Sequence, residues 1–168
     1  MRNRCVIRIC GVGAAVLMLA CVASAQAPAA NQANPANPTN PRFAKWKLKS
    51  NAAAPSSNIM TYEPFNGTGM KVTIESVNAI GTKSQWGYTT MFDGKDEPVT
   101  GRNGTATGAV RVITEQINEI IYKDAEGKIV QVLMNVLSPD GKTITVSYTS
   151  ANAQGLQKPT YATYERMQ

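Results

Sequence analysis

The chain has 168 residues, enough for one folded domain preceded by a leader. It carries 17 lysines and arginines against 11 aspartates and glutamates, a formal charge of +6, and it contains no histidine. Without histidine, and with no cysteine after residue 21, the Ser-His-Asp and Cys-His catalytic arrangements and the common transition-metal sites are excluded. No basic cluster interleaved with several aromatics is present, so the sequence gives no argument for nucleic-acid binding.

Residues 1–27 have the pattern of a secretory signal peptide. The basic start is formed by three arginines, Arg2, Arg4 and Arg8. An apolar run at 11–23 is too short to span a bilayer as a helix, and Ala-Gln-Ala at 25–27 is a small-x-small cleavage pattern. We therefore expect export to the periplasm or the extracellular space, with cleavage after Ala27. The alternative is a lipoprotein anchored at Cys21, because a small residue precedes that cysteine.

All cysteines, Cys5, Cys10 and Cys21, lie in this leader. The mature chain would have no disulfide, so its hydrophobic core must stabilise it alone. Its charge would be 14 − 11 = +3, because three of the basic residues and none of the acids are removed. Residues 28–41 contain only Ala, Asn, Pro, Gln and Thr. Because none of these side chains is charged or large and apolar, this segment predicts a disordered linker.

From residue 42 onward, apolar and polar residues alternate with the period of two that is typical of strands with one buried face. The clearest pair of strands is 70–76 and 84–92, reversing over 78–82. A register that opposes Ile74 to Trp86 places both apolar sets on one face, whereas a slip of one residue would break this match. The two segments therefore predict a hairpin with a defined register.

The same alternation recurs along the rest of the domain, at 43–49, 58–63, 97–100, 109–114, 117–123, 128–138, 143–150 and 160–166. Turn sequences such as Asp93-Gly94 and Pro139-Asp140-Gly141 separate these segments. Residues 101–108 and 151–158 predict loops, and the lysines of 43–49 predict the solvent face of an edge strand. About ten short strands and no helical period favour an all-β fold, a single antiparallel up-and-down barrel of about 8–10 strands over residues 42–168.

Several motifs of this domain are similar to those of a known protein family. These motifs are Trp86-Gly87-Tyr88, Phe92-Asp93-Gly94-Lys95-Asp96, Pro98-Val99-Thr100-Gly101, Ser138-Pro139-Asp140-Gly141-Lys142 and Ala153-Gln154-Gly155. The chain resembles the small secreted bacterial proteins called lipocalin-like, which have calycin-type β-barrels. These motifs are turn and core patterns, so the resemblance implies the fold and brings no ligand or catalytic residue with it. In the first strand the family's Gly-Thr-Trp is replaced by Ala44-Lys45-Trp46, so the mouth of the barrel is expected to differ.

The alternation predicts which side chains point into the barrel, and the candidate ligand-binding residues are taken from this inward-facing set. They are Trp46, Tyr62, Val72, Ile74, Trp86, Tyr88 and Phe92. Aromatic side chains either fill a small barrel or line an apolar pocket inside it. A carboxylate cluster at Asp93, Asp96 and Glu97 lacks the spacing of a calcium loop and has Lys95 within it, so it predicts a solvated turn and no metal site.

The sequence favours a secreted or periplasmic, non-enzymatic barrel that binds a small, apolar and uncharged molecule without metal or cofactor. The alternative is an envelope structural or protein-interaction module with a filled barrel and no ligand; a histidine-free hydrolase is a third, weaker hypothesis. We expect no nucleic-acid partner and no transmembrane segment in the mature chain, and no pattern indicates a protein partner. An internal void of about 300 Å³ lined by Trp86 and Tyr88 would favour the ligand-binding interpretation.

Overall fold

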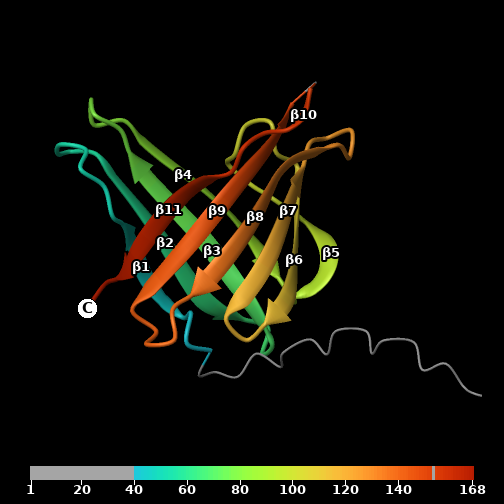
Figure 1. Ribbon diagram of the computed structural model, residues 1–168, viewed down its shortest axis with the longest axis horizontal. Coiled ribbons are helices and arrows are strands. Elements are labelled where there is room, and N and C mark those ends of the chain that lie inside the picture. Colours follow the sequence, from blue (N-terminus) through green and yellow to red (C-terminus); the bar gives the residue numbers. More distant parts are fainter. Residues whose placement is uncertain (1–39, 153) are drawn as a thin grey trace, which may run out of the picture. The chain divides into compact units, whose positions relative to one another are not determined.

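The computed structural model describes residues 40–152 and 154–168, and this part of the chain is built of antiparallel strands. The predicted signal peptide 1–27, with Cys21, and residues 28–39 of the predicted linker lie outside the described residues. The strands shown in Figure 1 are β1 (Ala44–Leu48), β2 (Ser57–Phe65), β3 (Gly69–Val77), β4 (Lys83–Thr90), β5 (Asp93–Pro98), β6 (Thr107–Thr114), β7 (Ile117–Lys123), β8 (Ile129–Leu137), β9 (Thr143–Asn152), β10 (Gly155–Leu156) and β11 (Thr160–Arg166).

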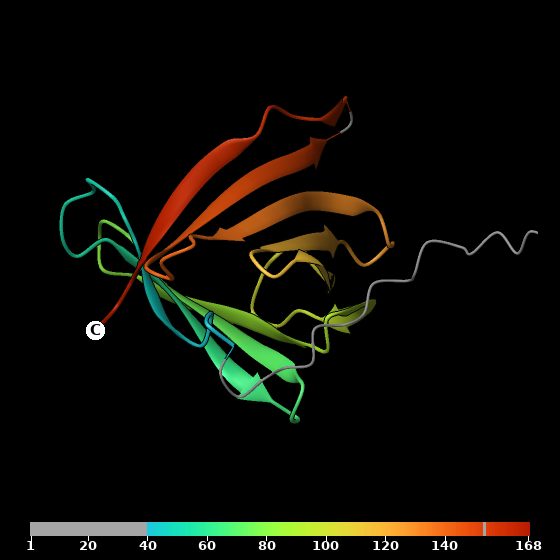
Figure 2. The same cartoon turned by 60° about the horizontal axis from the view of Figure 1, so that its bottom comes forward.

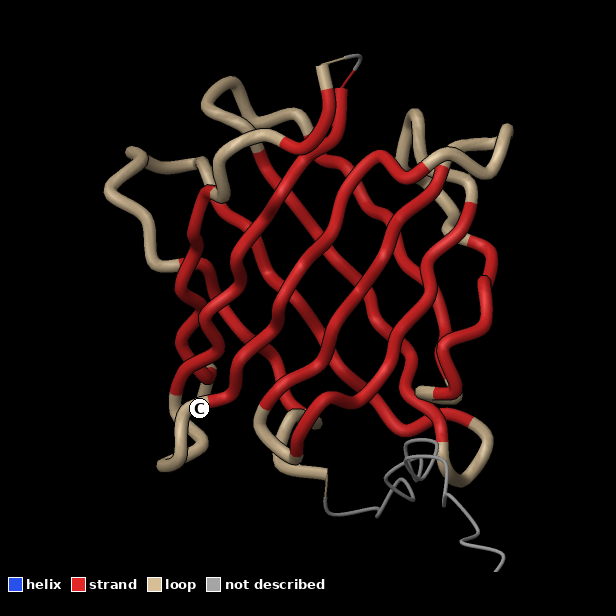
Figure 3. Tube along the Cα trace, turned by 45° about the vertical axis from the view of Figure 1, so that its right-hand side comes forward, coloured by secondary structure: helices blue, strands red, loops and turns tan. Residues whose placement is uncertain are grey.

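The strands form one continuous sheet that curls into a nearly closed barrel, consistent with a calycin-like fold (Figure 3). The order around the sheet is β4-β3-β2-β1-β11-β9-β8-β7-β6-β5, and β10 pairs with β9 beside this path. Most neighbours are hairpins between consecutive strands, whereas β1 and β11 join the two ends of the domain through pairs such as Trp46 with Arg166. The predicted all-β barrel is confirmed.

The barrel closes between β4 and the segment that follows β5. Gly87 and Thr100 form a single bridge there, in which each backbone N–H donates to the other's carbonyl oxygen at 3.0 and 2.9 Å. Both sides of this closing bridge depend on glycine. A Cβ on Gly87 would collide with the carbonyl oxygen of Val72, and Gly101 has a φ of +78° while its backbone passes against Gln85.

The predicted register of the central hairpin is confirmed, since Ile74 pairs with Trp86 and Val72 pairs with Tyr88 across β3 and β4. The inward residues of both sheet halves meet in one core, and Figure 2 shows β8, β9 and β11 curving over the interior opposite β2, β3 and β4. The largest side chains without appreciable exposure are Trp46, Tyr122, Ile144, Val72, Val110 and Val146. Successive strand residues point to opposite faces of the sheet, and the sequence alternates between apolar and polar residues. The side chains on the outer face of the barrel are therefore largely polar.

Several local predictions are wrong. Strand β1 is internal, paired with both β2 and β11, so its exposed lysines cover the outer face of the barrel and do not guard an edge. The predicted loop 101–108 ends earlier, because β6 already begins at Thr107, and the predicted loop 151–158 contains the short strand β10. Pairing with a neighbouring strand orders these segments although their own sequences carry turn residues.

The chain turns sharply before β5, which begins at Asp93 where the sequence predicted only a turn. Phe92 takes a positive φ of 59° and is nevertheless buried, with 5% of its surface exposed. Its backbone N–H donates to Oγ1 of Thr90 at 2.9 Å. Burial of the ring thus holds a non-glycine residue in a conformation that such residues rarely adopt.

Candidate functional site in the barrel interior

The interior of the barrel contains a partly open cavity of about 170 Å³. Its lining comes from β2, β3, β4, β7, β8, β9 and β11 together with Arg102, which lies between β5 and β6. An apolar cavity of about 150 Å³ is large enough to hold a benzene molecule. The space is therefore smaller than the void of about 300 Å³ expected for a typical ligand pocket, and it suits a compound of about one substituted ring.

Five of the seven predicted site residues line this cavity, and these are Tyr62, Val72, Ile74, Trp86 and Tyr88. The other two, Trp46 and Phe92, are buried elsewhere in the core. Trp46 has no exposed surface, its Nε1 donates to the carbonyl oxygen of Arg42 at 2.9 Å, and the guanidinium carbon of Arg166 lies 4.4 Å from the ring centroid. Trp46 is thus a structural residue of the core.

A cluster of three aromatic rings forms one wall of the cavity. Trp86 and Tyr88 are stacked with centroids 6.4 Å apart, and Tyr122 meets each of them edge-on at 5.9 Å. Such edge-to-face contacts are the favoured geometry for aromatic rings. Tyr122 is not among the predicted site residues, although the alternation of 117–123 placed it on the same parity as Ile120, which also lines the cavity.

Arg102 is a further cavity residue that was not predicted from the sequence. Its guanidinium carbon lies 4.7 Å from the ring centroid of Trp86 and 4.4 Å from that of Tyr122, so the cation sits against the aromatic wall. Its Nη2 donates to Oε1 of Gln131 at 2.7 Å. The cavity lining therefore includes a charged side chain, whereas all seven predicted site residues are uncharged. Arg102 lies in a glycine-rich segment, and a loop sequence carries no periodicity that would show where a side chain points.

A second arginine, Arg42, contacts a residue that lines the cavity. Arg42 is only 3% exposed, its Nη1 donates to the carbonyl oxygen of Glu115 at 2.9 Å, and its Nε donates to Oδ1 of Asn135 at 3.5 Å. Asn135, which lines the cavity, donates in turn to the hydroxyl oxygen of Tyr62 at 2.8 Å. Within the described residues, Nη2 of Arg42 has no hydrogen-bond partner. Burial lowers the pKa of this arginine from its ordinary value.

The interior tyrosines remain neutral phenols. Burial raises the pKa of Tyr62 and of Tyr88 well above the ordinary value, with a further contribution from a neighbouring tyrosine in each case. Burial also raises the pKa values of Tyr122, Tyr148 and Tyr164. At neutral pH these hydroxyl groups therefore offer protons for hydrogen bonding, and their oxygens carry no charge.

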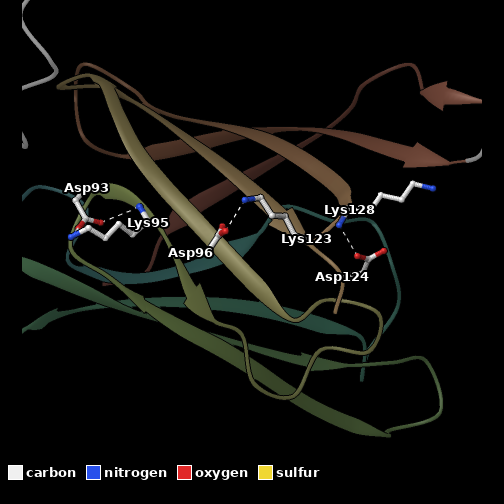
Figure 4. A network of polar contacts seen from close by, with 6 residues as sticks. All are labelled: Asp93, Lys95, Asp96, Lys123, Asp124 and Lys128. Atoms are coloured by element: carbon white, nitrogen blue, oxygen red, sulfur yellow. Dashed lines mark hydrogen bonds and ion pairs between the residues drawn. The ribbon is translucent and has the colours of Figure 1, made fainter. Parts of the chain in front are cut away.

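Carboxylates of the predicted turn lie on the outer surface and are held by lysines (Figure 4). Asp93 pairs with Lys95 at 2.7 Å and Asp96 pairs with Lys123 at 2.6 Å. Lys95 lowers the pKa of Asp93 through its hydrogen bonds to that carboxylate. In the part of the chain that the structure describes, no group of three or more metal-ligating side chains is suited to hold an ion.

A shallow groove of about 580 Å³ runs along the outside of the closing bridge. It is larger than the interior cavity, but its walls include outward side chains such as Lys71 and Gln85, and it opens broadly to solvent. Three residues, Val72, Trp86 and Tyr88, line both spaces. We regard the interior cavity as the candidate site because it is less open than the groove and is lined by aromatic rings and polar groups, which is how small-molecule sites are built.

Comparison of the chain with models of protein families, with curated proteins and with solved structures gives no match. Within residues 40–152 and 154–168, no helix has the length and hydropathy needed to cross a membrane. The cavity itself is therefore the basis for assigning a function. It combines a ring-sized volume, an aromatic wall, neutral hydroxyl donors and one cationic side chain at Arg102.

Proposed function

We propose that this protein is an exported, non-enzymatic, lipocalin-like barrel that binds one small ring compound in its interior. The observation that carries the proposal is the interior cavity beside Trp86, Tyr88 and Tyr122. A planar apolar ring placed there would exchange water for contact with three aromatic side chains, which is favourable at about 25 cal/mol per Å² of apolar surface removed from water. No metal or cofactor enters this binding mode.

The test is a titration of the purified protein with indole and toluene, two uncharged ring compounds that match the cavity in size. Binding is measured by calorimetry and by the fluorescence of Trp86, which lines the cavity. We expect saturable binding with a stoichiometry of one, unchanged by a chelator.

Two variants on β9 show whether the probe occupies the interior. Val146 is 2% exposed and lines the cavity, so Val146→Phe would fill the space, whereas Thr145→Phe places the same ring on the outer face. We expect at least a tenfold loss of affinity for Val146→Phe and no change for Thr145→Phe. Thermal melts verify that both variants fold. Absence of saturation in the wild-type protein, or equal effects of the two variants, would refute the interior site.

The alternative function, an envelope structural or interaction module, is favoured by a different observation. Two large hydrophobic side chains that follow β9 in the chain are exposed, Leu156 of β10 at 66% and Tyr161 of β11 at 70%. Exposed large apolar side chains can contribute to protein-interaction surfaces. If no ring compound saturates the folded protein, this surface becomes the better hypothesis.

A further inference from the structure

Arg102 is a cation without a carboxylate partner among the described residues. The described ion pairs are Lys49–Glu165, Lys95–Asp93, Arg111–Glu119 and Lys123–Asp96. Arg102 instead donates to the neutral amide of Gln131 and rests against two aromatic rings. Among the described side chains that line the cavity, none is an aspartate or glutamate, and Arg102 is the sole cation.

We propose that the ligand of this cavity is a small aromatic carboxylate, whose ring packs against Trp86 and Tyr122 while its carboxylate binds the guanidinium of Arg102. The inference rests on the proposed function and defines the chemical class of its ligand. It replaces the uncharged ligand that the sequence alone favoured.

The guanidinium is already oriented for such a ligand. Arginine has five N–H donors in one plane, and the hydrogen bond to Gln131 uses one on Nη2. The contacts with Trp86 and Tyr122 hold the group at the aromatic wall, at 4.7 and 4.4 Å. A carboxylate can therefore accept two parallel hydrogen bonds from the remaining donors while its attached ring lies beside the aromatic cluster.

The other polar groups of the interior also favour an acceptor. The hydroxyl oxygen of Tyr62 accepts from Asn135, so its own proton is left to be donated. Arg42 places a second cation beneath Asn135, and no carboxylate is among its described hydrogen-bond partners. An uncharged ligand would leave Arg102 buried further without a counter-ion, whereas a carboxylate would both pair with the guanidinium and accept from nearby donors.

The experiment compares benzoate with benzamide, which have nearly the same shape and differ in charge. We expect the wild-type protein to bind benzoate roughly 10- to 100-fold more tightly than benzamide, the range expected for a charge-assisted bidentate pair. Arg102→Met should remove this preference by weakening benzoate alone. Arg102→Lys, which keeps the charge and loses the bidentate geometry, should retain part of it.

The control is Arg111→Met, which removes an exposed arginine paired with Glu119 on the outer face of the barrel. It should bind both probes as the wild type does. Calorimetry gives the affinities, and thermal melts verify that each variant is folded. Inorganic phosphate, titrated in parallel, should neither bind tightly nor compete with benzoate, because it has no ring to occupy the aromatic wall.

Equal binding of benzoate and benzamide by the wild type would overturn the carboxylate inference and leave the proposed ring-binding function intact. A loss of benzamide binding in Arg102→Met as large as that of benzoate would also overturn it, because Arg102 would then only shape the cavity. Binding of phosphate as tight as that of benzoate, or equal weakening by Arg111→Met, would indicate a general anion site. If none of indole, toluene, benzoate and benzamide binds, the proposed function itself fails.

Discussion

Trp46→Ala should be the most destabilising substitution of a single aromatic residue in this barrel. Trp46 has no exposed surface and lies in β1, between β2 and β11. Its indole N–H donates to the backbone carbonyl oxygen of Arg42, and its ring makes a cation–π contact with the guanidinium of Arg166. The substitution therefore removes a buried hydrophobic group, a buried hydrogen bond and a cation–π contact together.

The magnitude follows from these parts. A fully buried aromatic side chain covers about 150–250 Å², which at about 25 cal/mol per Å² corresponds to about 4–6 kcal/mol. Loss of the hydrogen bond adds about 1 kcal/mol, and loss of the cation–π contact adds a similar amount. Because these terms are not additive and the core relaxes in part, we expect a loss of about 5 kcal/mol, at the upper end of the range for Trp→Ala.

Trp86→Ala should cost less. The sequence alone predicts about 3–5 kcal/mol for it, as for any buried aromatic. Trp86 is only half-buried, however, and it already borders the cavity and the outer groove, so its removal enlarges existing space. We expect about 2 kcal/mol, and almost nothing for the exposed Lys47→Ala on β1.

Urea unfolding followed by far-ultraviolet circular dichroism compares these three variants, because tryptophan fluorescence is altered by the substitutions themselves. A loss of 5 kcal/mol could unfold a protein of ordinary stability, so Trp46→Phe, expected at about 2 kcal/mol, provides a milder measurement. A loss for Trp86→Ala equal to or greater than that for Trp46→Ala would refute the assignment of Trp46 as the structural residue.

Two further predictions concern the closing bridge and the buried phenols. Gly87→Ala should destabilise the barrel by about 1–3 kcal/mol, because the added Cβ meets the carbonyl oxygen of Val72, while Ser84→Ala on the same strand should be nearly neutral in the same urea assay. Burial raises the pKa values of Tyr62, Tyr88 and Tyr122, so the folded state holds these protons more tightly than the unfolded state does. Stability is therefore full below about pH 10 and falls as the pH rises above it. The tyrosinate absorbance of these buried phenols, recorded in Tyr161→Phe because Tyr161 is 70% exposed, should rise together with the loss of dichroism, and their reversible ionisation with the fold intact would contradict this.

Hairpins between consecutive strands could be predicted from sequence because their signal is local. Alternation fixes which residues face inward, and a turn sequence fixes where the chain reverses, so the pairing of Ile74 with Trp86 followed from the residues alone. Strand β7 at Ile117–Lys123 and strand β11 at Thr160–Arg166 also have the bounds that the alternation predicted.

Features set by closure of the barrel could not be predicted in this way. The lysines of β1 have the same spacing on an edge strand as on an internal one, and only the pairing of β1 with β11 distinguishes the two. Arg102 points inward because the segment after β5 returns to β4 at the Gly87–Thr100 bridge. Such contacts join segments whose own sequences contain no signal for each other.

The pairing of β1 with β11 has a consequence for the order of folding. Trp46 and Arg166 are 166 − 46 = 120 positions apart, so bringing them together directly from an unfolded chain would cost about 4 kcal/mol in loop-closure entropy. Once the intervening hairpins have formed, far less of the chain is free and this cost is much smaller. The β1–β11 joint should therefore form after the main folding barrier. Substitutions that weaken it should accelerate unfolding and leave the folding rate almost unchanged, so this joint governs how long the folded barrel lasts.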